Sequence, residues 1–133
     1  MKILNFGSLN MDYVYQVPHF VQPGETLAAG GRSIKLGGKG LNQSIALARA
    51  GVRVCHAGCI GQGGEELKRF LEENGVDTEG LMQVPDMQGH TVIQVNPQGE
   101  NCILLHSAHL LRLHIAMSKN TKRQKNVQIK HTQ

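Results

Sequence analysis

Glycines flanked by hydrogen-bonding side chains make residues 37–43 the segment of this sequence best suited to bind a ligand. Three glycines surround Lys39, and the segment leads directly into a run of helix-forming residues. Glycine lets a backbone approach a ligand closely, and the first turn of a helix offers free N–H groups and positive potential. Lys39 and Asn42 add side-chain donors. The segment therefore predicts a site for hydroxyl groups or an anion, with a simple strand-to-helix turn as the alternative.

The spacing excludes two common nucleotide-binding loops. A Walker A loop would need glycine where Ser33 stands, and Ser or Thr after Lys39, where the sequence has Gly40. A dinucleotide fingerprint would need its third glycine at Gln43. The segment therefore belongs to neither loop type.

A second polar pair, Asn10 and Asp12, follows the first predicted strand. We place the pair beyond the carboxyl end of that strand, where open parallel sheets bind their ligands. A carboxamide and a carboxylate two residues apart can share the neighbouring hydroxyls of a sugar as donor and acceptor. Ordinary turn chemistry is the alternative for this pair.

The segments around these residues predict an α/β domain with a parallel sheet. Residues 2–7 and 52–58 are short apolar strand candidates, and the Ala-rich and Leu-rich residues 42–50 predict a helix that ends before Gly51. Strand, glycine loop, helix and strand in this order are typical of parallel α/β folds. Residues 65–74 predict a second, amphipathic helix.

A β-hairpin is predicted over residues 91–105. Thr91–Val95 and Asn101–Leu105 are β-rich and are separated by Asn-Pro-Gln-Gly-Glu, a typical hairpin loop. Residues 13–17 and 26–36 contain further strand candidates. Because hairpin edges must be paired or covered, we expect other strands to join this one.

The composition changes near residue 106. Residues 1–100 contain 8 Lys/Arg and 10 Asp/Glu, whereas residues 101–133 contain 6 Lys/Arg and no acid. We expect residues 107–133 to be an unrelated basic tail, with a short amphipathic helix over residues 106–117 and disorder beyond it. The tail has no Phe, Trp or Tyr for base stacking, so nucleic-acid binding is not expected.

Cysteine usage and hydropathy predict a cytoplasmic protein without a membrane span. The three cysteines have no disulfide-framework spacing, and the first residues are too polar for a signal peptide. Two groups of residues could in principle bind metal: Cys55, His56 and Cys59, and the histidines at 106, 109 and 114. On the predicted strand His56 faces away from the two thiols, and the histidines lack a further ligand, so no metal site is expected.

Four sequence motifs, taken in order, resemble the N-terminal region of ribokinase-like members of the PfkB family of carbohydrate kinases. They are GSLNMD, PGET at Pro23 to Thr26, GGKGLNQSIALARAG, and NGVDT at Asn74 to Thr78. The resemblance covers residues 1–106. It implies an α/β fold, the N-terminal part of a doubly wound sheet with a small β-sheet lid, and it makes residues 1–106 the sugar-binding part including the lid strands.

The resemblance also assigns sugar-binding residues. In the family the first and third motifs bind the sugar, and the strands around PGET form the lid with the later hairpin, often as a dimer interface. The residues that match are Asn10, Met11, Asp12, Gly38, Lys39, Gly40, Leu41 and Asn42.

The family's catalytic G-A-G-D loop and nucleotide site have no match in this sequence. The resemblance therefore implies ATP-dependent phosphorylation of ribose or a similar sugar, with this chain supplying only the sugar site and lid. We expect no catalytic residue here and no binding of ATP or Mg²⁺ by the chain alone. The alternatives are an inactive truncated isoform that pairs through its lid with a full-length kinase, a homodimer formed through the same lid, and a nucleoside or fructose-type kinase of the superfamily.

Overall fold

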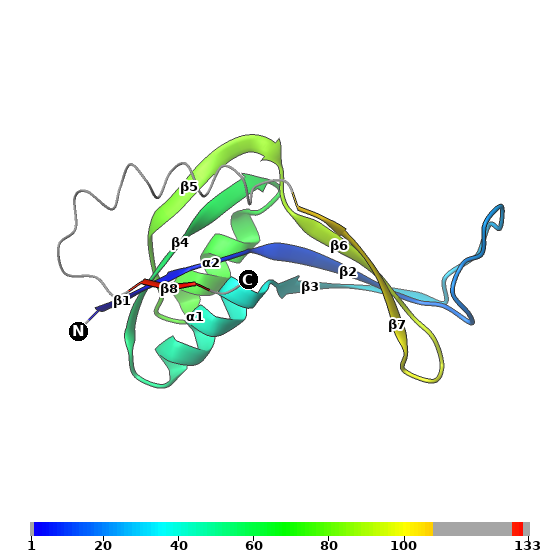
Figure 1. Cartoon of the computed structure of the whole chain (residues 1–133), viewed down its shortest axis with the longest axis horizontal. Helices are drawn as coiled ribbons and strands as arrows, with labels where there is room; N and C mark the ends of the chain where they lie inside the picture. Colours follow the sequence, from blue (N-terminus) through cyan, green and yellow to red (C-terminus); the bar gives the residue numbers. More distant parts are fainter. Residues whose placement is uncertain (1, 108–128, 132–133) are drawn as a thin grey trace.

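The structure is a computed structural model that describes residues 2–107 and 129–131 (Figure 1). It contains two four-stranded sheets, one in a body with two helices and one that extends away from the body as a lid. The body sheet has the strand order β5-β4-β1-β8, and the lid sheet has the order β3-β2-β6-β7.

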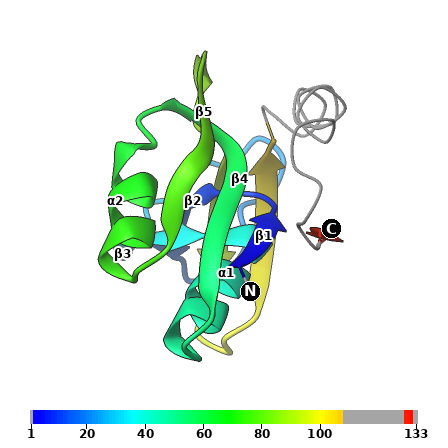
Figure 2. The ribbon, with the colours of Figure 1, turned by 90° about the vertical axis from the view of Figure 1, so that its left-hand side faces the viewer.

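The body is built from parallel strands joined through helices. Its strands are β1 (Lys2–Phe6), β4 (Arg53–Gln62), β5 (Asp77–Met87) and β8 (Ile129–His131), and its helices are α1 (Lys39–Arg49) and α2 (Glu65–Glu73). Because β1, β4 and β5 follow one another across the sheet, right-handed crossovers place both helices on the same face. The view in Figure 2 shows these three strands side by side with the two helices.

The lid is made by two excursions of the chain out of the body. The first consists of β2 (Asn10–Gln16) and β3 (Gly31–Gly37), and the second of β6 (His90–Val95) and β7 (Asn101–His106). Each excursion is an antiparallel pair, and β2 joins them by pairing in parallel with β6. The predicted hairpin and the expected strands around PGET are therefore confirmed.

The β6–β7 turn shows how the local sequence directs the hairpin. The side-chain oxygen of Asn96 accepts hydrogen bonds from the backbone N–H groups of Gln98 and Glu100, at 3.1 and 2.9 Å. Gly99 has a φ of 80°, a conformation that costs little only for glycine. This turn fixes the register in which Val92 pairs with Leu104.

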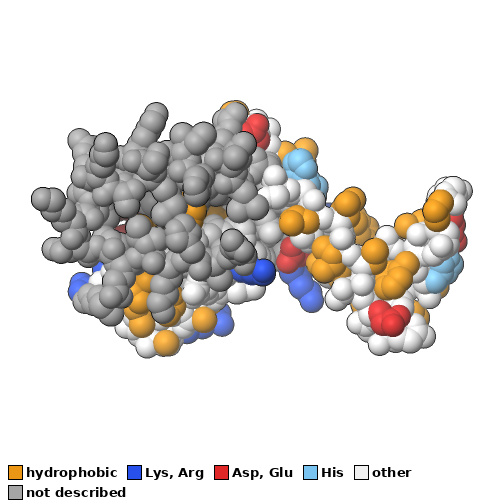
Figure 3. All heavy atoms as spheres, in the orientation of Figure 1, with side chains coloured by type: hydrophobic (Ala, Val, Ile, Leu, Met, Phe, Trp, Pro, Cys, Tyr) orange, Lys and Arg blue, Asp and Glu red, His pale blue; other side chains and the backbone are white. Residues whose placement is uncertain are grey.

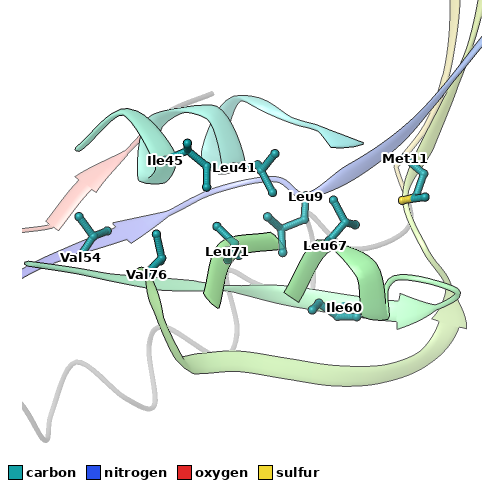
Figure 4. Close-up of a cluster of buried hydrophobic side chains, with 9 residues drawn as sticks. All are labelled: Leu9, Met11, Leu41, Ile45, Val54, Ile60, Leu67, Leu71 and Val76. Carbon is teal, nitrogen blue, oxygen red and sulfur yellow. The ribbon is translucent and has the colours of Figure 1, made fainter. Parts of the chain in front are cut away.

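The main hydrophobic core lies between the two helices and the body sheet (Figure 4). It consists of side chains that are almost fully buried: Leu9, Met11, Leu41, Ile45, Val54, Ile60, Leu67, Leu71 and Val76. Each fully buried Leu contributes about 1.5–3 kcal/mol relative to an exposed one. The core thus holds both helices against the sheet, and it reaches the base of the lid through Leu9 and Met11.

Four expectations from the sequence need correction. Residues 77–87 form β5 although no strand was predicted there, and α1 begins three residues earlier than expected. Residues 129–131 form β8, which pairs in parallel with β1, so the expected disorder is wrong at these residues. In the expected helix over residues 106–117, His106 instead ends β7, and residues 108–117 lie outside the described part of the chain.

Candidate functional site

The two glycine-containing motifs meet in the structure through their backbones. A Cβ atom on Gly40 would lie 2.6 Å from the Cα of Gly7, and one on Gly7 would lie 2.7 Å from the Cα of Gly40. A Cβ atom on Gly38, whose φ is 104°, would lie 2.4 Å from the Ser8 carbonyl oxygen. Only glycine permits such contacts, so the Gly7–Ser8 turn and the first turn of α1 form one rigid unit.

A direct hydrogen bond strengthens this unit. The backbone N–H of Leu41 donates to the Ser8 carbonyl at 3.2 Å, while the N–H of Asn42 makes the first regular helical bond, to Gly38. Gly40 therefore lies inside α1 because its backbone must approach Gly7. This explains why the helix starts within the glycine cluster.

Asn10 and Asp12 follow the carboxyl end of β1 and lie within the strand β2 at the base of the lid. They lie on a strand because the chain passes through Gly7 to Leu9 and immediately resumes as a strand of the second sheet. Side chains alternate along a strand, so Asn10 and Asp12 share one face of the lid, and Met11 faces the other way.

The carboxylate of Asp12 has a fixed position. Thr91 on the neighbouring strand β6 donates its hydroxyl to Asp12 Oδ1 at 2.6 Å. The other carboxylate oxygen lies against Gly37, where any Cβ atom would overlap it. One oxygen is therefore held by a partner, and glycine provides the space for the other.

Asn10 is accommodated in a similar way on the opposite side. Its Oδ1 atom would lie 2.9 Å from a Cβ on Gly89, and Gly89 accepts the backbone N–H of Met11 at 3.0 Å. A half-buried carboxylate and carboxamide on one strand face supply hydrogen-bond acceptors and donors for neighbouring hydroxyls. This chemistry suits a sugar.

The remaining predicted site residues divide into two groups. The side chains of Lys39 and Asn42 are exposed in the first turn of α1. Met11 and Leu41 are 6% and 1% exposed and pack in the core. The structure therefore brings Asn10, Asp12 and the backbone of residues 38–40 together, whereas Met11 and Leu41 support the site from the core.

A buried polar network lies beneath the Gly7–Gly40 contact. Asn5 Nδ2 donates to the Gly40 carbonyl at 2.9 Å and to Ser44 Oγ at 2.7 Å. Ser44 Oγ lies 2.7 Å from His56 Nδ1, and His56 Nε2 lies 3.3 Å from the Gly7 carbonyl. Burial lowers the pKa of His56 to about 4, which keeps its ring neutral at pH 7.

A second buried amide connects the lid to the body. Gln88, which is 3% exposed, lies between β5 and β6. Its Nε2 atom donates to the Leu9 carbonyl at 2.6 Å, and its Oε1 atom accepts the N–H of Gly61 at 2.9 Å. Gln88 therefore links both points at which the chain leaves the body for the lid.

Sequence reasoning missed Thr91, Gln88 and the partners of His56. The sequence predicts a strand at Thr91, but only the strand register shows that Thr91 pairs with Asp12. The sequence offers His56 as a possible metal ligand, and the structure instead pairs it with Ser44. Asn5 and His56 are polar residues in buried strands, where apolar residues are expected. Such a residue indicates a buried hydrogen-bond partner, and this pattern could have identified both residues from the sequence.

Two kinds of feature are not found in the described part of the chain. Residues 2–107 and 129–131 contain no group of three or more His, Cys, Asp or Glu side chains that could hold a metal ion. No helix in these residues is long and apolar enough to cross a membrane. Part of the possible histidine cluster, His109 and His114, lies outside the described residues.

The comparisons with known proteins match this architecture. The model of the pfkB family carbohydrate kinases matches residues 1–132. The chain is 40% identical over 119 residues to the ribokinase of Haemophilus influenzae, covering 85% of this chain and 39% of the relative. It is 32% identical to the deoxyribokinase of Salmonella typhi, covering 79% of this chain and 35% of the relative.

A solved structure of a ribokinase gives the same result. The ribokinase of Cryptococcus neoformans var. grubii serotype A, crystallised in complex with ADP, superimposes with a TM-score of 0.73 and is 45% identical. The match covers 79% of this chain and 34% of that one. The chain therefore belongs to the pfkB family of carbohydrate kinases and has a ribokinase-like α/β fold. It spans a little over a third of the length of the curated relatives it matches.

Proposed function

We propose that this chain forms the sugar-binding part of a carbohydrate kinase that phosphorylates ribose. The observation that carries the proposal is the Asp12 carboxylate, held by Thr91 and adjacent to the rigid unit of Gly7 and Gly40. In this position the free oxygen of Asp12 accepts hydrogens from sugar hydroxyls, and Asn10 adds a donor on the same face. The backbone at the start of α1 completes the site.

Ribose is the proposed sugar because the segment GGKGLNQ and the triplet Asn-Met-Asp together are typical of ribokinases. A related pentose is the nearest alternative, since a deoxyribokinase is among the relatives. A nucleoside or fructose-type kinase is the wider alternative. These candidate substrates would fill the space around Asp12 differently. Competition between them for binding to the chain therefore distinguishes the alternatives.

ATP and Mg²⁺ would serve the reaction by supplying the phosphoryl group and neutralising its charge. The chain's own residues do not fit this role, because the sequence has no G-A-G-D loop and its glycine segment lacks the Walker A spacing. We therefore assign no catalytic residue and derive no phosphoryl-transfer step here. Sugar binding without ATP binding is the proposed property of this chain, with the cytoplasm as the proposed compartment.

A second candidate function is association with another kinase chain. The lid carries large exposed apolar side chains, with Ile103 at 54%, Leu104 at 72% and Leu105 at 54% exposure. Apolar side chains gather on the face of the lid drawn in Figure 3. Because side chains alternate along a strand, Ile103 and Leu105 share one face of β7 and Leu104 lies on the other. Exposed apolar side chains on an edge strand are typical of interaction surfaces. A second copy of this chain or a full-length kinase is the proposed partner, bound through the lid.

Calorimetric titration of the chain with ribose tests the first proposal, with 2-deoxyribose, fructose and adenosine as competitors. We expect saturable ribose binding that Asp12→Asn weakens and Glu73→Gln, an exposed change on α2, leaves unchanged. Labelled ATP with Mg²⁺ should show no saturation below about 1 mM, which corresponds to roughly −4 kcal/mol. Ribose binding that is insensitive to Asp12→Asn would contradict the assignment.

A further inference from the structure

Three polar side chains from three elements are completely buried beneath the sugar site. Asn5 lies on β1, Ser44 on α1 and His56 on β4, and each is 0% exposed. Buried polar side chains are costly unless they are hydrogen-bonded. In this case their bonds end on the carbonyls of Gly7 and Gly40, the two residues whose backbones meet in the site.

The hydrogen bonds allow one arrangement of protons. The Gly7 carbonyl can only accept, so His56 Nε2 must carry the hydrogen of the neutral ring. His56 Nδ1 is then an acceptor and takes the hydroxyl hydrogen of Ser44. Ser44 Oγ in turn accepts from Asn5 Nδ2, whose second hydrogen goes to the Gly40 carbonyl. Three of the bonds therefore run in one direction from Asn5 through Ser44 and His56 to Gly7, and the fourth ends on Gly40.

The surroundings of His56 leave little room for another arrangement. Gly58 lies beside the ring, where a Cβ would be 3.3 Å from His56 Nε2 and 3.1 Å from the Gly7 carbonyl oxygen. The charged groups near this part of β4 are Lys2, Asp77 and Glu79, and they act on Cys55, on the other face of the strand. Burial lowers the pKa of His56, and the hydrogen bond to the Gly7 carbonyl opposes part of this effect.

We propose that His56 is a positioning residue for the sugar site, which fixes the Gly7–Ser8 turn against the first turn of α1 through the Gly7 carbonyl and Ser44. This inference rests on the proposed function, because it adds a role for three residues that do not contact the sugar. His56 acts through the backbone of Gly7, and the Leu41 N–H bond to Ser8 reports whether the turn is in place. Protonation of His56 would give Nδ1 a hydrogen and break the bond from Ser44.

The experiment compares the chain with His56→Leu, Ser44→Ala and the conservative His56→Gln, which keeps one donor and one acceptor. Cys59→Ala is the matched control, because Cys59 is 4% exposed on the same strand and packs in a separate cluster. Amide hydrogen exchange is measured at Leu41 and, as an internal reference in the lid, at Val17, whose N–H bonds to Val95. Ribose affinity is measured in parallel.

We expect His56→Leu and Ser44→Ala to accelerate exchange at Leu41 by roughly tenfold, the effect of losing about one buried hydrogen bond, with Val17 unchanged. Ribose affinity should fall by a similar factor, and His56→Gln should restore part of both. Nitrogen chemical shifts of the His56 ring at pH 7 should show hydrogen on Nε2 alone. In the parent chain, the protection factor at Leu41, which corrects for the slower intrinsic exchange at low pH, should fall as the pH approaches 4, and this response should be absent in His56→Leu.

Two results would overturn the positioning role. One is a ring that carries hydrogen on Nδ1 at pH 7. The other is a set of variants whose exchange at Leu41 changes no more than in Cys59→Ala. If His56→Leu does not fold, Ser44→Ala and the ring shifts of the parent chain decide the question. Failure of the parent chain to bind ribose would refute the proposed function instead, and the exchange data would still test the positioning role.

Discussion

Gly7 and Gly40 are in backbone contact, although 32 residues separate them in the sequence. A Cβ on Gly40 would lie 2.5 Å from the carbonyl carbon of Gly7 and 2.7 Å from the N atom of Ser8. These neighbours are backbone atoms, so they cannot rotate away as a flexible side chain would. The contact joins the turn after β1 to the helix that follows the lid excursion.

Gly40→Ala should therefore destabilise the chain by about 1–3 kcal/mol, the usual cost of inserting an atom into a packed interior. Urea denaturation followed by circular dichroism measures the effect. Gly31→Ala is the control, because its Cβ would meet nothing closer than 3.8 Å and no positive φ is involved. A Gly40→Ala chain as stable as Gly31→Ala would show that the close contact is absent in solution.

Removal of the Gln88 side chain should loosen the attachment of the lid. Gln88→Ala leaves the Leu9 carbonyl and the Gly61 N–H without their partner in a buried region. Each unsatisfied group costs about 1–3 kcal/mol. We expect a loss of stability together with faster hydrogen exchange at Met11, whose N–H bonds to Gly89. Met82→Ala, an exposed change on β5, serves as the control. Exchange at Met11 that is equal in both variants would contradict this role of Gln88.

The buried ring of His56 makes stability dependent on pH. Its pKa is lowered from 6.5 to about 4, so below pH 6.5 the unfolded chain binds a proton that the folded chain does not. The stabilisation is therefore fully present above pH 6.5 and is lost as the pH falls towards 4, by roughly 3 kcal/mol in total. The pKa of Asp77 is also lowered, by its hydrogen bond with Lys2, but from 3.8, so its contribution is lost at lower pH.

Denaturation series at pH 7, 6 and 5 test this dependence, and the same series on His56→Leu provides the comparison. The parent chain should lose stability over this range, and the variant should lose much less. Parallel pH profiles of the two chains would mean that His56 is not buried as a neutral ring.

Much of the fold could be predicted because local chemistry determines it. Both helices, the first strands and the β6–β7 hairpin follow from hydrophobic pattern, glycine positions and the Asn96 turn. β5 was missed because its sequence, with glycine, proline and three acids, has low strand propensity, and pairing with β4 overrides it.

The site was predicted in part for a similar reason. The types and spacing of Asn10 and Asp12 point to hydroxyl binding, and their motifs identify the family. Their place on a lid strand, and the hydrogen bond from Thr91, depend on pairing between residues 79 positions apart. No local pattern specifies such a register, and the same holds for Gln88 and Leu9.

The exposed apolar side chains of the lid predict self-association. Ile34 on β3 and Ile103, Leu104 and Leu105 on β7 are 48–72% exposed, and β3 and β7 are the two edge strands of the lid sheet. Sedimentation velocity should show dimers or larger species at high concentration. Leu104→Asp should shift the chain towards monomer, whereas Met82→Asp, an exposed apolar position on β5, should not. A clean monomer at high concentration would argue against the lid as an interface.

The hydrogen bond between Thr91 and Asp12 leads to a prediction about catalysis, which requires a nucleotide site. A chimera that joins residues 1–106 to the catalytic half of a full-length ribokinase should phosphorylate ribose. In this chimera Asp12→Ala should lower kcat/KM about 30- to 1000-fold, since one charged hydrogen-bonded contact contributes roughly 2–4 kcal/mol.

Thr91→Val should have a smaller effect than Asp12→Ala, because it frees the carboxylate to move without removing it, and Thr91→Ser should restore activity by returning the hydroxyl. Gly37→Ala should resemble Thr91→Val, since its Cβ would displace the second carboxylate oxygen. Gly31→Ala, in the same strand and free of close contacts, is the control. A coupled assay of ADP release at varied ribose concentrations measures all four variants and Asp12→Ala. If Asp12→Ala left kcat/KM within about twofold of the parent, a difference below roughly 0.5 kcal/mol, Asp12 would have no role in binding the sugar.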